Sequence, residues 1–517
     1  MYTARIVAAV ACVLVAVALH HARSPLPPPP PLPRPVPTLD WSVVQDGAAL
    51  RGELPPTPVL LRGSPMQAWH TAHRDAWAVS TVAALAAETD AGDYNVTWLS
   101  QRHTRDFINH NRERYDQYDF VDGSEGSAPR HQRRVATLRS ALRELWRDSS
   151  SSDDSSSHYV TAFIDDLPRQ PFQTLTEWLP AGCLRDDRFE AASEWDESVA
   201  DHSTLADCRN LNSVVWFGAA NVRVSTHYDI SHNLFFQLSG SKRFDLLPPS
   251  AHSALRLYPF WHGSNRQAQA SLPLADSDQP MWRAELEPGD VLLLPSRWFH
   301  RVESLSASIG INWWTGGLDR DVWLYVLGAN RDEEAWDGGT RWSRLACARQ
   351  LNGISSSSSS SAAAAGAASS MRLDVLDCAR DGFAALLACL EHGTPEHPRM
   401  GRQQLSRRAK ALLQARYEPI RQALPSGVAA AAVTEHCQKH QRRGVMTAGK
   451  DAHSLASDGE WIAAVQNAAM ALRLLSATNL DLALDDLLDH TAAWAVGQAV
   501  PGGADGAAVW AFLTDCT

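Results

Sequence analysis

Six short runs rich in β-branched, aromatic and aliphatic residues constrain the fold of this chain more than any other feature. They lie at 213–217, 222–226, 234–238, 243–247, 291–294 and 309–314. Turn signals separate several of them, including Ser-Gly-Ser at 239–241 and Glu-Pro-Gly-Asp at 287–290. Short strands spaced in this way predict a β-sandwich, jelly roll or barrel.

Low-complexity tracts divide the rest of the chain. A Ser/Asp run at 149–157 and a Ser/Ala-rich linker at 351–370 cannot bury a core and are expected on the surface. Residues 39–146 indicate helices and loops rich in tryptophan. After 371, Ala/Leu-rich faces with helical spacing predict an α-helical C-terminal region, 371–517, with helices at 375–390, 403–413, 461–475 and 482–496. Helical packing or a homodimer through these helices is its expected role.

An apolar run near the N-terminus bears on the compartment. Arg5 precedes apolar residues 6–19, which are short for a membrane span of about 20 residues but suit a signal peptide. We expect residues 1–24 to be a signal peptide or, alternatively, an uncleaved membrane anchor, and either predicts the secretory pathway. A leader without function would leave a cytoplasmic or nuclear location. The proline-rich residues 25–38 predict a stiff linker.

His227 and Asp229 are the first candidates for metal ligands. Residues i and i+2 of a strand point to the same face, so both side chains are expected to face one cavity. His300, which ends the stretch PGDVLLLPSRWFH, supplies a third ligand from another strand. Two imidazoles and one carboxylate on iron leave three positions open, which suits a bidentate 2-oxo acid and dioxygen. A His-x-Asp pair alone is a weak signal, because surface and core pairs share it.

Lys242 adds to this pattern. It follows the 239–241 turn, and we expect it to begin the strand that pairs with the strand at 233–238. A lysine that faces into a barrel is costly unless it meets an anion, and the distal carboxylate of 2-oxoglutarate is such an anion. The alternative is a solvated hairpin lysine.

The order of these motifs resembles the cupin-like branch of the Jumonji (JmjC) oxygenases. The matching segments are HYD, Asn233, GSKR, a PP pair, PGDVLLLPSRWFH and INWW, within a core at 210–317. Residues 58–63 resemble the family's entry strand and extend the domain to 39–330. The resemblance implies a double-stranded β-helix (jelly roll, cupin) with N-terminal helical elements. It also implies Fe(II), 2-oxoglutarate and O2 as cofactor and cosubstrates.

The resemblance also implies roles for individual residues. The residues His227, Asp229 and His300 match the iron ligands, and Lys242 matches the lysine that pairs with the C5 carboxylate of 2-oxoglutarate. Three polar residues match the lining of the cosubstrate pocket: Asn233, Asn312 and Tyr159. A core tyrosine is the alternative for the last of these.

Two further segments bear on binding. Val224 stands where many relatives have a Thr or Ser that bonds 2-oxoglutarate, and Ser225 is a candidate substitute. Arg266 and Gln267 begin an RQAQ segment that resembles one with which peptide-hydroxylating relatives hold substrate. A polar surface loop is the alternative.

Three functions remain open at this point. The first is a protein or peptide hydroxylase, and the second an oxygenase that acts on RNA, a histone or a small molecule. The third is a catalytically silent binding domain. The net charge of −11 argues against a nucleic-acid partner, because such proteins need basic surface to displace counterions.

Overall fold

A computed structural model describes the chain in segments. They are residues 32–41, 56–88, 94–101, 106–107, 131–146, 157–164, 167, 213–258, 265–270, 272, 280–315, 318–327, 375–392, 411–412, 415–416 and 458–499. The expected leader at 1–24 and the linker at 351–370 lie outside these segments, as do most of the Ser/Asp run and most of the helix predicted at 403–413. Within the described segments, no helix is both long and apolar enough to cross a membrane.

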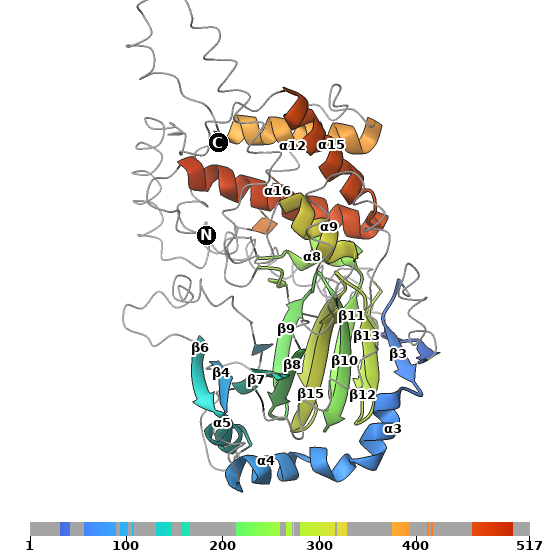
Figure 1. Ribbon diagram of the computed structural model, residues 1–517, viewed down its shortest axis with the longest axis vertical. Coiled ribbons are helices and arrows are strands. Elements are labelled where there is room, and N and C mark those ends of the chain that lie inside the picture. The colour runs from blue at the N-terminus through green and yellow to red at the C-terminus, as the bar shows by residue number, and fades with distance from the viewer. Residues whose placement is uncertain are drawn as a thin grey trace, which may run out of the picture.

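Eight antiparallel strands form the predicted jelly roll (Figure 1). They are β8 (Ser213–Gly218), β9 (Arg223–His227), β10 (His232–Ser239), β11 (Lys242–Leu247), β12 (Trp282–Leu286), β13 (Val291–Leu294), β14 (Phe299–Ser304) and β15 (Ser308–Thr315). One sheet has the order β8-β15-β10-β13 and the other β9-β14-β11-β12. The chain therefore crosses from one sheet to the other at most of its turns, which confirms the double-stranded β-helix.

The two strands that the sequence pattern does not mark are β12 and β14. Both mix charged with apolar residues, reading WRAEL and FHRVES, and each has residues that stay partly or fully exposed. Because their outward positions are polar, neither forms a continuous apolar run. The other six runs fall on strands within two residues of their predicted limits.

The strand that begins at Lys242 lies in a different sheet from the one expected. β11 pairs with β12 and β14, whereas β10 pairs with β13 and β15. The turn at 239–241 is therefore a crossing between sheets and not a hairpin. Gly240 makes this crossing possible, because its φ is +65° and a Cβ there would lie 2.0 Å from the carbonyl oxygen of Ala307.

Alternate residues of the central strands face two different cores. Phe235 of β10 lies in the cluster between the two sheets, together with Phe244 and Leu292. Its neighbours Leu234 and Phe236 lie in the cluster on the outer face of the larger sheet. The two-residue period of a strand explains this division. Burial on both faces explains why the sequence of this strand is apolar almost throughout.

The N-terminal part contributes strands as well as helices, which corrects the expectation of helices and loops for 39–146. The entry strand expected at 58–63 is confirmed, since it is present as β3 (Val59–Arg62). β2 (Thr38–Asp40), β3 (Val59–Arg62), β7 (Ser157–Phe163), β4 (Asn95–Gln101) and β6 (His131–Thr137) widen the larger sheet, and β5 (Asp106–Phe107) borders the smaller one. The helices α4 (Val79–Glu88) and α5 (Leu138–Leu145) cover the outer core. The helix α3 (Pro65–Ala72) contacts it through His70, whose ring lies against that of Phe236. The end of the proline-rich segment joins the fold, because β1 (Arg34–Pro35) pairs with β12 at a sheet edge, where proline is tolerated.

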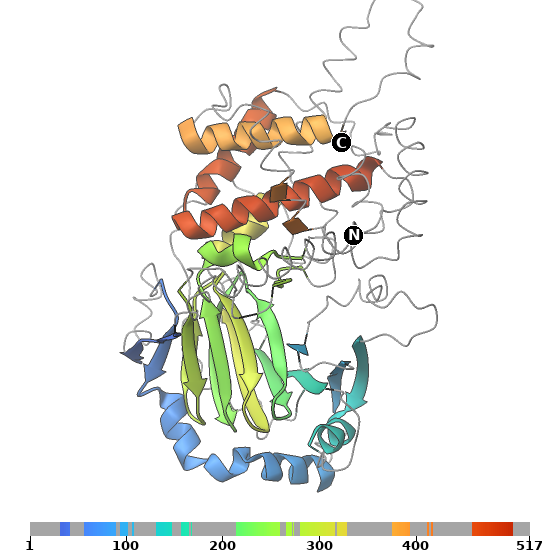
Figure 2. The same ribbon diagram turned by 180° about the vertical axis from the view of Figure 1, so that it is seen from behind.

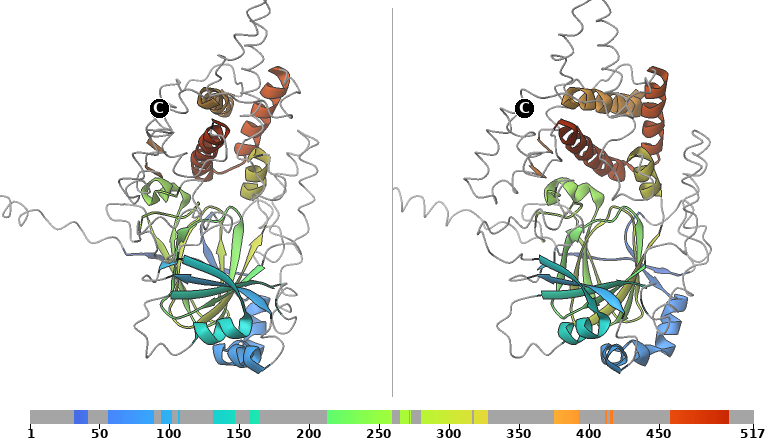
Figure 3. Two further views of the ribbon diagram at one scale, coloured as in Figure 1. Left: turned by 90° about the vertical axis from the view of Figure 1, so that its left-hand side faces the viewer. Right: turned by 60° about the vertical axis from the view of Figure 1, so that its left-hand side comes forward.

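Helices from the C-terminal half gather over one end of the barrel, opposite α3 and α4 (Figures 1 and 2). They are α9 (Leu318–Leu327), α12 (Val375–His392), α15 (Asp458–Leu472) and α16 (Ala477–Ala499). One apolar cluster joins them to the barrel, since Tyr228 and Phe299 pack in it with Leu482 and Leu487 of α16. Figure 3 shows the same placement from two other sides. The C-terminal helices and the barrel therefore share a core.

Candidate metal centre

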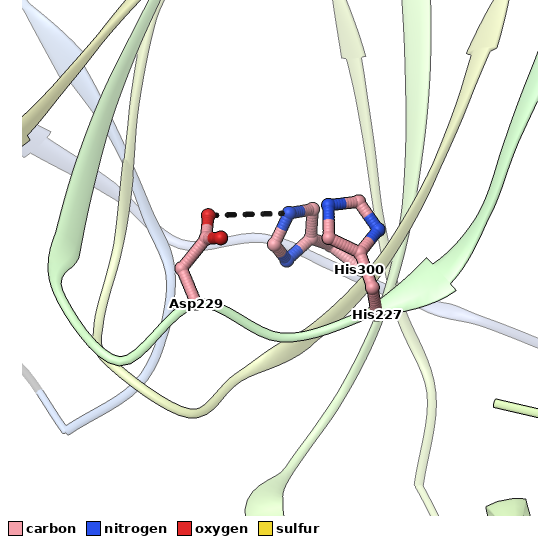
Figure 4. A group of neighbouring side chains, drawn as sticks. All are labelled: His227, Asp229 and His300. Atoms are coloured by element: carbon pink, nitrogen blue, oxygen red, sulfur yellow. Dashed lines mark ion pairs between the residues drawn. The ribbon is translucent and has the colours of Figure 1, made fainter. Parts of the chain in front are cut away.

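His227, Asp229 and His300 converge at the helix-covered end of the barrel. Their ligand atoms all lie within 4.8 Å of one another. The two histidines are directly paired residues of β9 and β14, and their ring centroids are 4.1 Å apart. Asp229 Oδ2 lies 3.7 Å from His300 Nε2, and Figure 4 shows the carboxylate facing the two rings.

The two residues of the His-x-Asp pair do not share a strand face as expected. His227 is the last residue of β9, and Asp229 lies in the turn that leads to β10. The turn, and not strand alternation, brings the carboxylate back toward the rings. The three predicted residues meet, although the geometric reason for expecting them to meet was wrong.

Backbone carbonyls orient both imidazoles. His227 Nδ1 lies 2.8 Å from the carbonyl oxygen of Ser225, and His300 Nδ1 lies 3.0 Å from that of Trp298. An Nδ1 that donates to a carbonyl leaves Nε2 as the lone-pair nitrogen, which is the arrangement of metal-binding histidines.

Two side chains donate to the Asp229 carboxylate. Asn233 Nδ2 lies 3.2 Å and Trp314 Nε1 2.9 Å from Asp229 Oδ2. Asn233 was a predicted site residue, whereas Trp314 was not. A signal for Trp314 exists in the sequence, because it stands two residues after Asn312 and so shares its strand face.

Electrostatics keeps the cluster in its ligand forms. Burial, and then the neighbouring His300, lower the pKa of His227 to about 4, although Asp229 opposes them. Burial acts to raise the pKa of Asp229, but His300 and His227 outweigh it and hold that pKa below its ordinary value. Near pH 7 the chain therefore offers a neutral His227 imidazole and an ionised Asp229 carboxylate.

Lys242 is fully buried in the barrel interior. Its Nζ donates to Tyr159 Oη at 2.7 Å and lies 5.5 Å from the centre of the Phe235 ring. No carboxylate in the described part of the chain pairs with it. Burial lowers the pKa of Lys242 from 10.5 to about 7, because the pocket removes the ammonium from water. Such a group calls for an anion.

The remaining predicted pocket residue, Asn312, lies near these groups. Trp216 Nε1 donates to Asn312 Oδ1 at 2.6 Å, and the Trp216 ring contacts those of Tyr159 and Trp314. These contacts link the surroundings of Lys242 to those of Asp229. Val224 is half-buried against the same Tyr159 cluster, so an apolar side chain stands where many relatives carry a hydroxyl.

The predicted substrate segment lies beside the ligand strand. Gln267 is buried and forms an isolated antiparallel β-bridge with His227. The carbonyl oxygen of Arg266 accepts a hydrogen bond from the N–H of Tyr228 at 3.3 Å. Arg266 has a positive φ of 67° and lies close enough to His227 and Asp229 to influence their pKa values. The segment borders the metal centre.

The described geometry suits a divalent cation with open coordination positions. Two imidazole nitrogens and one carboxylate oxygen form the facial set typical of non-haem iron. A buried ammonium in the same barrel supplies a second anchor for an anionic ligand of that metal.

Comparison with known proteins supports this interpretation. The family model for the cupin-like domain matches residues 54–315. The lysine-specific demethylase JMJ31 of Arabidopsis thaliana is 35% identical over 123 residues, which is 22% of each chain. Jumonji C domain-containing protein 5 of Drosophila melanogaster is 32% identical over 23% of this chain and 32% of its own. Human tRNA wybutosine-synthesizing protein 5 is 32% identical over 20% and 33%. The matches thus span about a fifth to a third of these relatives.

Proposed function

The chain belongs to the cupin-like domain family, and we propose that it is an Fe(II)- and 2-oxoglutarate-dependent oxygenase of the JmjC type that hydroxylates a protein or peptide side chain. The observation that carries the proposal is the convergence of His227, Asp229 and His300 within 4.8 Å. A silent binding domain would have no need for this intact set.

The residues present fit both groups that the proposal requires. His227, Asp229 and His300 would hold the iron, since their donor set is the one that this metal takes in oxygenases. Lys242 would bind the distal carboxylate of 2-oxoglutarate, because it is a buried ammonium without a carboxylate partner in the described residues. Tyr159 would add a hydroxyl at that carboxylate.

When bound, iron and 2-oxoglutarate supply the oxidising power for attack on a C–H bond. The chain's own residues position and shield these groups. Asn233 and Trp314 fix the Asp229 carboxylate through hydrogen bonds, and the aromatic rings of Trp216 and Phe235 exclude water from the pocket around Lys242. Gln267 and Arg266 would contact the substrate from the edge of β9.

The substrate class rests on charge and on the relatives. A chain with a net charge of −11 lacks the overall basic character that tRNA binding requires, although the wybutosine-synthesizing relatives are named for tRNA. The relative JMJ31 is named for action on lysine, a protein side chain. We therefore favour a protein or peptide.

The test is Fe(II)-dependent formation of succinate from 2-oxoglutarate by the purified full chain and by Asp229→Ala. A matched control is Asp290→Ala, which removes a buried carboxylate that bonds Arg62 and the N–H of Glu287, away from the metal centre. We expect succinate from the wild type and the control and at least a hundredfold less from Asp229→Ala. Equal turnover by the two variants would remove the proposal.

For the compartment, we propose that the apolar run at 6–19 directs the chain to the secretory pathway, as a signal peptide or a membrane anchor. A C-terminal tag followed by fractionation and protease protection tests this. Protection within vesicles supports it, and tagged protein in the cytosol or nucleus overturns it.

A further inference from the structure

A carboxylate of the C-terminal helix α16 reaches the loops that carry the metal ligands. Asp486 is buried, and its Oδ2 accepts a hydrogen bond from the hydroxyl of Tyr228. The same carboxylate pairs with Arg297 Nη1 at 3.5 Å and accepts from Arg416 Nη2 at 2.9 Å. One residue of α16 therefore touches two separate segments of the barrel.

Both of these segments adjoin the metal centre. Tyr228 stands between His227 and Asp229 in the chain. The backbone N–H of Arg297 donates to the carbonyl oxygen of Asp229 at 2.7 Å, and three residues later the chain reaches His300. Fixing Tyr228 and Arg297 thus fixes backbone next to all three ligands.

The position of Arg297 depends on its acidic partners. Its side chain is fully buried and its backbone has a φ of +64°, a conformation that non-glycine residues adopt at a cost. Nε donates to Asp319 Oδ1 at 3.0 Å, and the guanidinium lies over the rings of Tyr228 and Trp323. A buried guanidinium keeps its place only where anions balance its charge.

We propose that Asp486 is a positioning residue for the metal centre, through which the C-terminal helical region holds the Tyr228 and Arg297 loops in the geometry that binds metal. This rests on the proposed function, because it concerns the affinity of the same site. Asp486 touches neither metal nor substrate; it acts through the backbone on both sides of Asp229.

The competing explanation is that Asp486 only docks α16 onto the barrel. The adjacent Asp485 provides the matched control. It is also buried, and it pairs with His252 Nδ1 at 3.3 Å. His252 belongs to the short helix α8 (His252–Leu255) and not to the ligand loops. Replacement of Asp485 therefore tests the docking of α16 onto the barrel while the contacts of Asp486 with Tyr228 and Arg297 are kept.

The experiment titrates metal-free full chain with Co(II) and follows its visible absorption in wild type, Asp486→Asn and Asp485→Asn. We expect Asp486→Asn to bind Co(II) about tenfold more weakly, with a changed spectrum, since outer-shell changes typically cost ten- to a hundredfold in metal affinity. Asp485→Asn is expected to match the wild type in affinity and spectrum, although its thermal midpoint also falls. Tyr228→Phe, which keeps every ion pair, should lose a few-fold in affinity.

Wild-type affinity in Asp486→Asn, or an equal loss in Asp485→Asn, would overturn the proposal. If Asp486→Asn does not fold, Tyr228→Phe decides, and an unchanged affinity there overturns it. Failure of the wild type to bind Co(II) at all would instead overturn the proposed function, and this inference with it.

Discussion

Lys242 is a residue that selection for stability alone would not place in the interior of a barrel. A lysine in the interior of a β-barrel loses hydration, and here the described residues return one hydroxyl contact from Tyr159 and two aromatic faces. Apolar side chains of similar length would fill the same space without that cost. The residue is therefore best explained by what it binds.

Replacing Lys242 with Met separates binding from stability. The KM for 2-oxoglutarate is expected to rise about a hundredfold, because a charge-assisted pair to a carboxylate is lost. The thermal midpoint in the absence of cosubstrate is expected to stay level or to rise, because a buried ammonium is removed. Succinate assays and thermal denaturation measure the two effects. An unchanged KM would contradict the assigned role.

Cosubstrate binding is expected to weaken as the pH rises above about 7. The pKa of Lys242 in the free protein is lowered to about 7, so above that pH its amine is mainly neutral and must take up a proton to meet a carboxylate. The dissociation constant should therefore rise toward about tenfold per pH unit at alkaline pH. Calorimetry with the Mn(II)-loaded chain measures it.

The control for this pH dependence is Lys242→Arg, since a guanidinium stays charged throughout the range. The affinity of this variant for 2-oxoglutarate should fall much less than that of the wild type as the pH rises above about 7. The same slope in both proteins would assign the titration to another group.

Among the elements, the turn at Gly240 connects the two sheets and leads to β11, whose first residue, Lys242, is buried in the interior. Gly240→Ala would place a methyl group 2.0 Å from the Ala307 carbonyl oxygen and strain a φ of +65°. We expect a loss of about 2–4 kcal/mol in the free energy of unfolding and a raised KM for 2-oxoglutarate. Urea denaturation measures the first, and a change within 0.5 kcal/mol would contradict the steric argument.

The strands that could be predicted from sequence are those with an unambiguous apolar run. β13 matches its predicted limits, and the start of β8 does too. β12 and β14 could not be found because charged residues interrupt their patterns. The predicted partner of β11 was wrong, because turn residues indicate only where a chain reverses direction. The Ser-Gly-Ser turn is compatible both with a hairpin within one sheet and with a crossing between two sheets.

At the metal centre, residue types were more predictable than geometry. Motif order brought forward His227, Asp229, His300 and Lys242 as candidates. The structure places the first three within 4.8 Å of one another and Tyr159 beside Lys242. The bond from Trp314 to Asp229 was missed, since a tryptophan on a strand is most often packing. The contacts of Asp486 could not be predicted, because the sequence around it in α16 does not indicate which distant loop the helix packs against.

At the scale of the whole molecule, the described C-terminal helices and the barrel share one apolar cluster. This cluster contains Phe299 of the barrel and Leu255 of α8 together with Leu472 and Leu487 of the C-terminal helices, all fully buried. The described helices beyond the cupin-like domain are therefore packed against it through a common core. A homodimer through these helices stays a prediction.

Truncation after residue 330 is expected to abolish soluble expression. Removal of α12, α15 and α16 would expose the barrel side of the shared cluster and leave Arg297 without Asp486. Exposed apolar surface of this kind causes aggregation. Comparison of soluble yield and dye binding for 1–330 and the full chain measures this. A soluble truncated protein that still turns over 2-oxoglutarate would contradict it.

The Lys242 ammonium has no carboxylate partner among the described residues, and this has a consequence for the lifetime of the protein. A ligand that binds only the folded chain stabilises it by RT ln(1 + [L]/Kd), or about 2.7 kcal/mol at a hundredfold excess over Kd. Under the proposed function, 2-oxoglutarate is such a ligand. Starvation for this 2-oxo acid would then raise the unfolded fraction about a hundredfold and expose the chain to quality-control proteases. The abundance of the protein, and not only its turnover, would follow the supply of its cosubstrate.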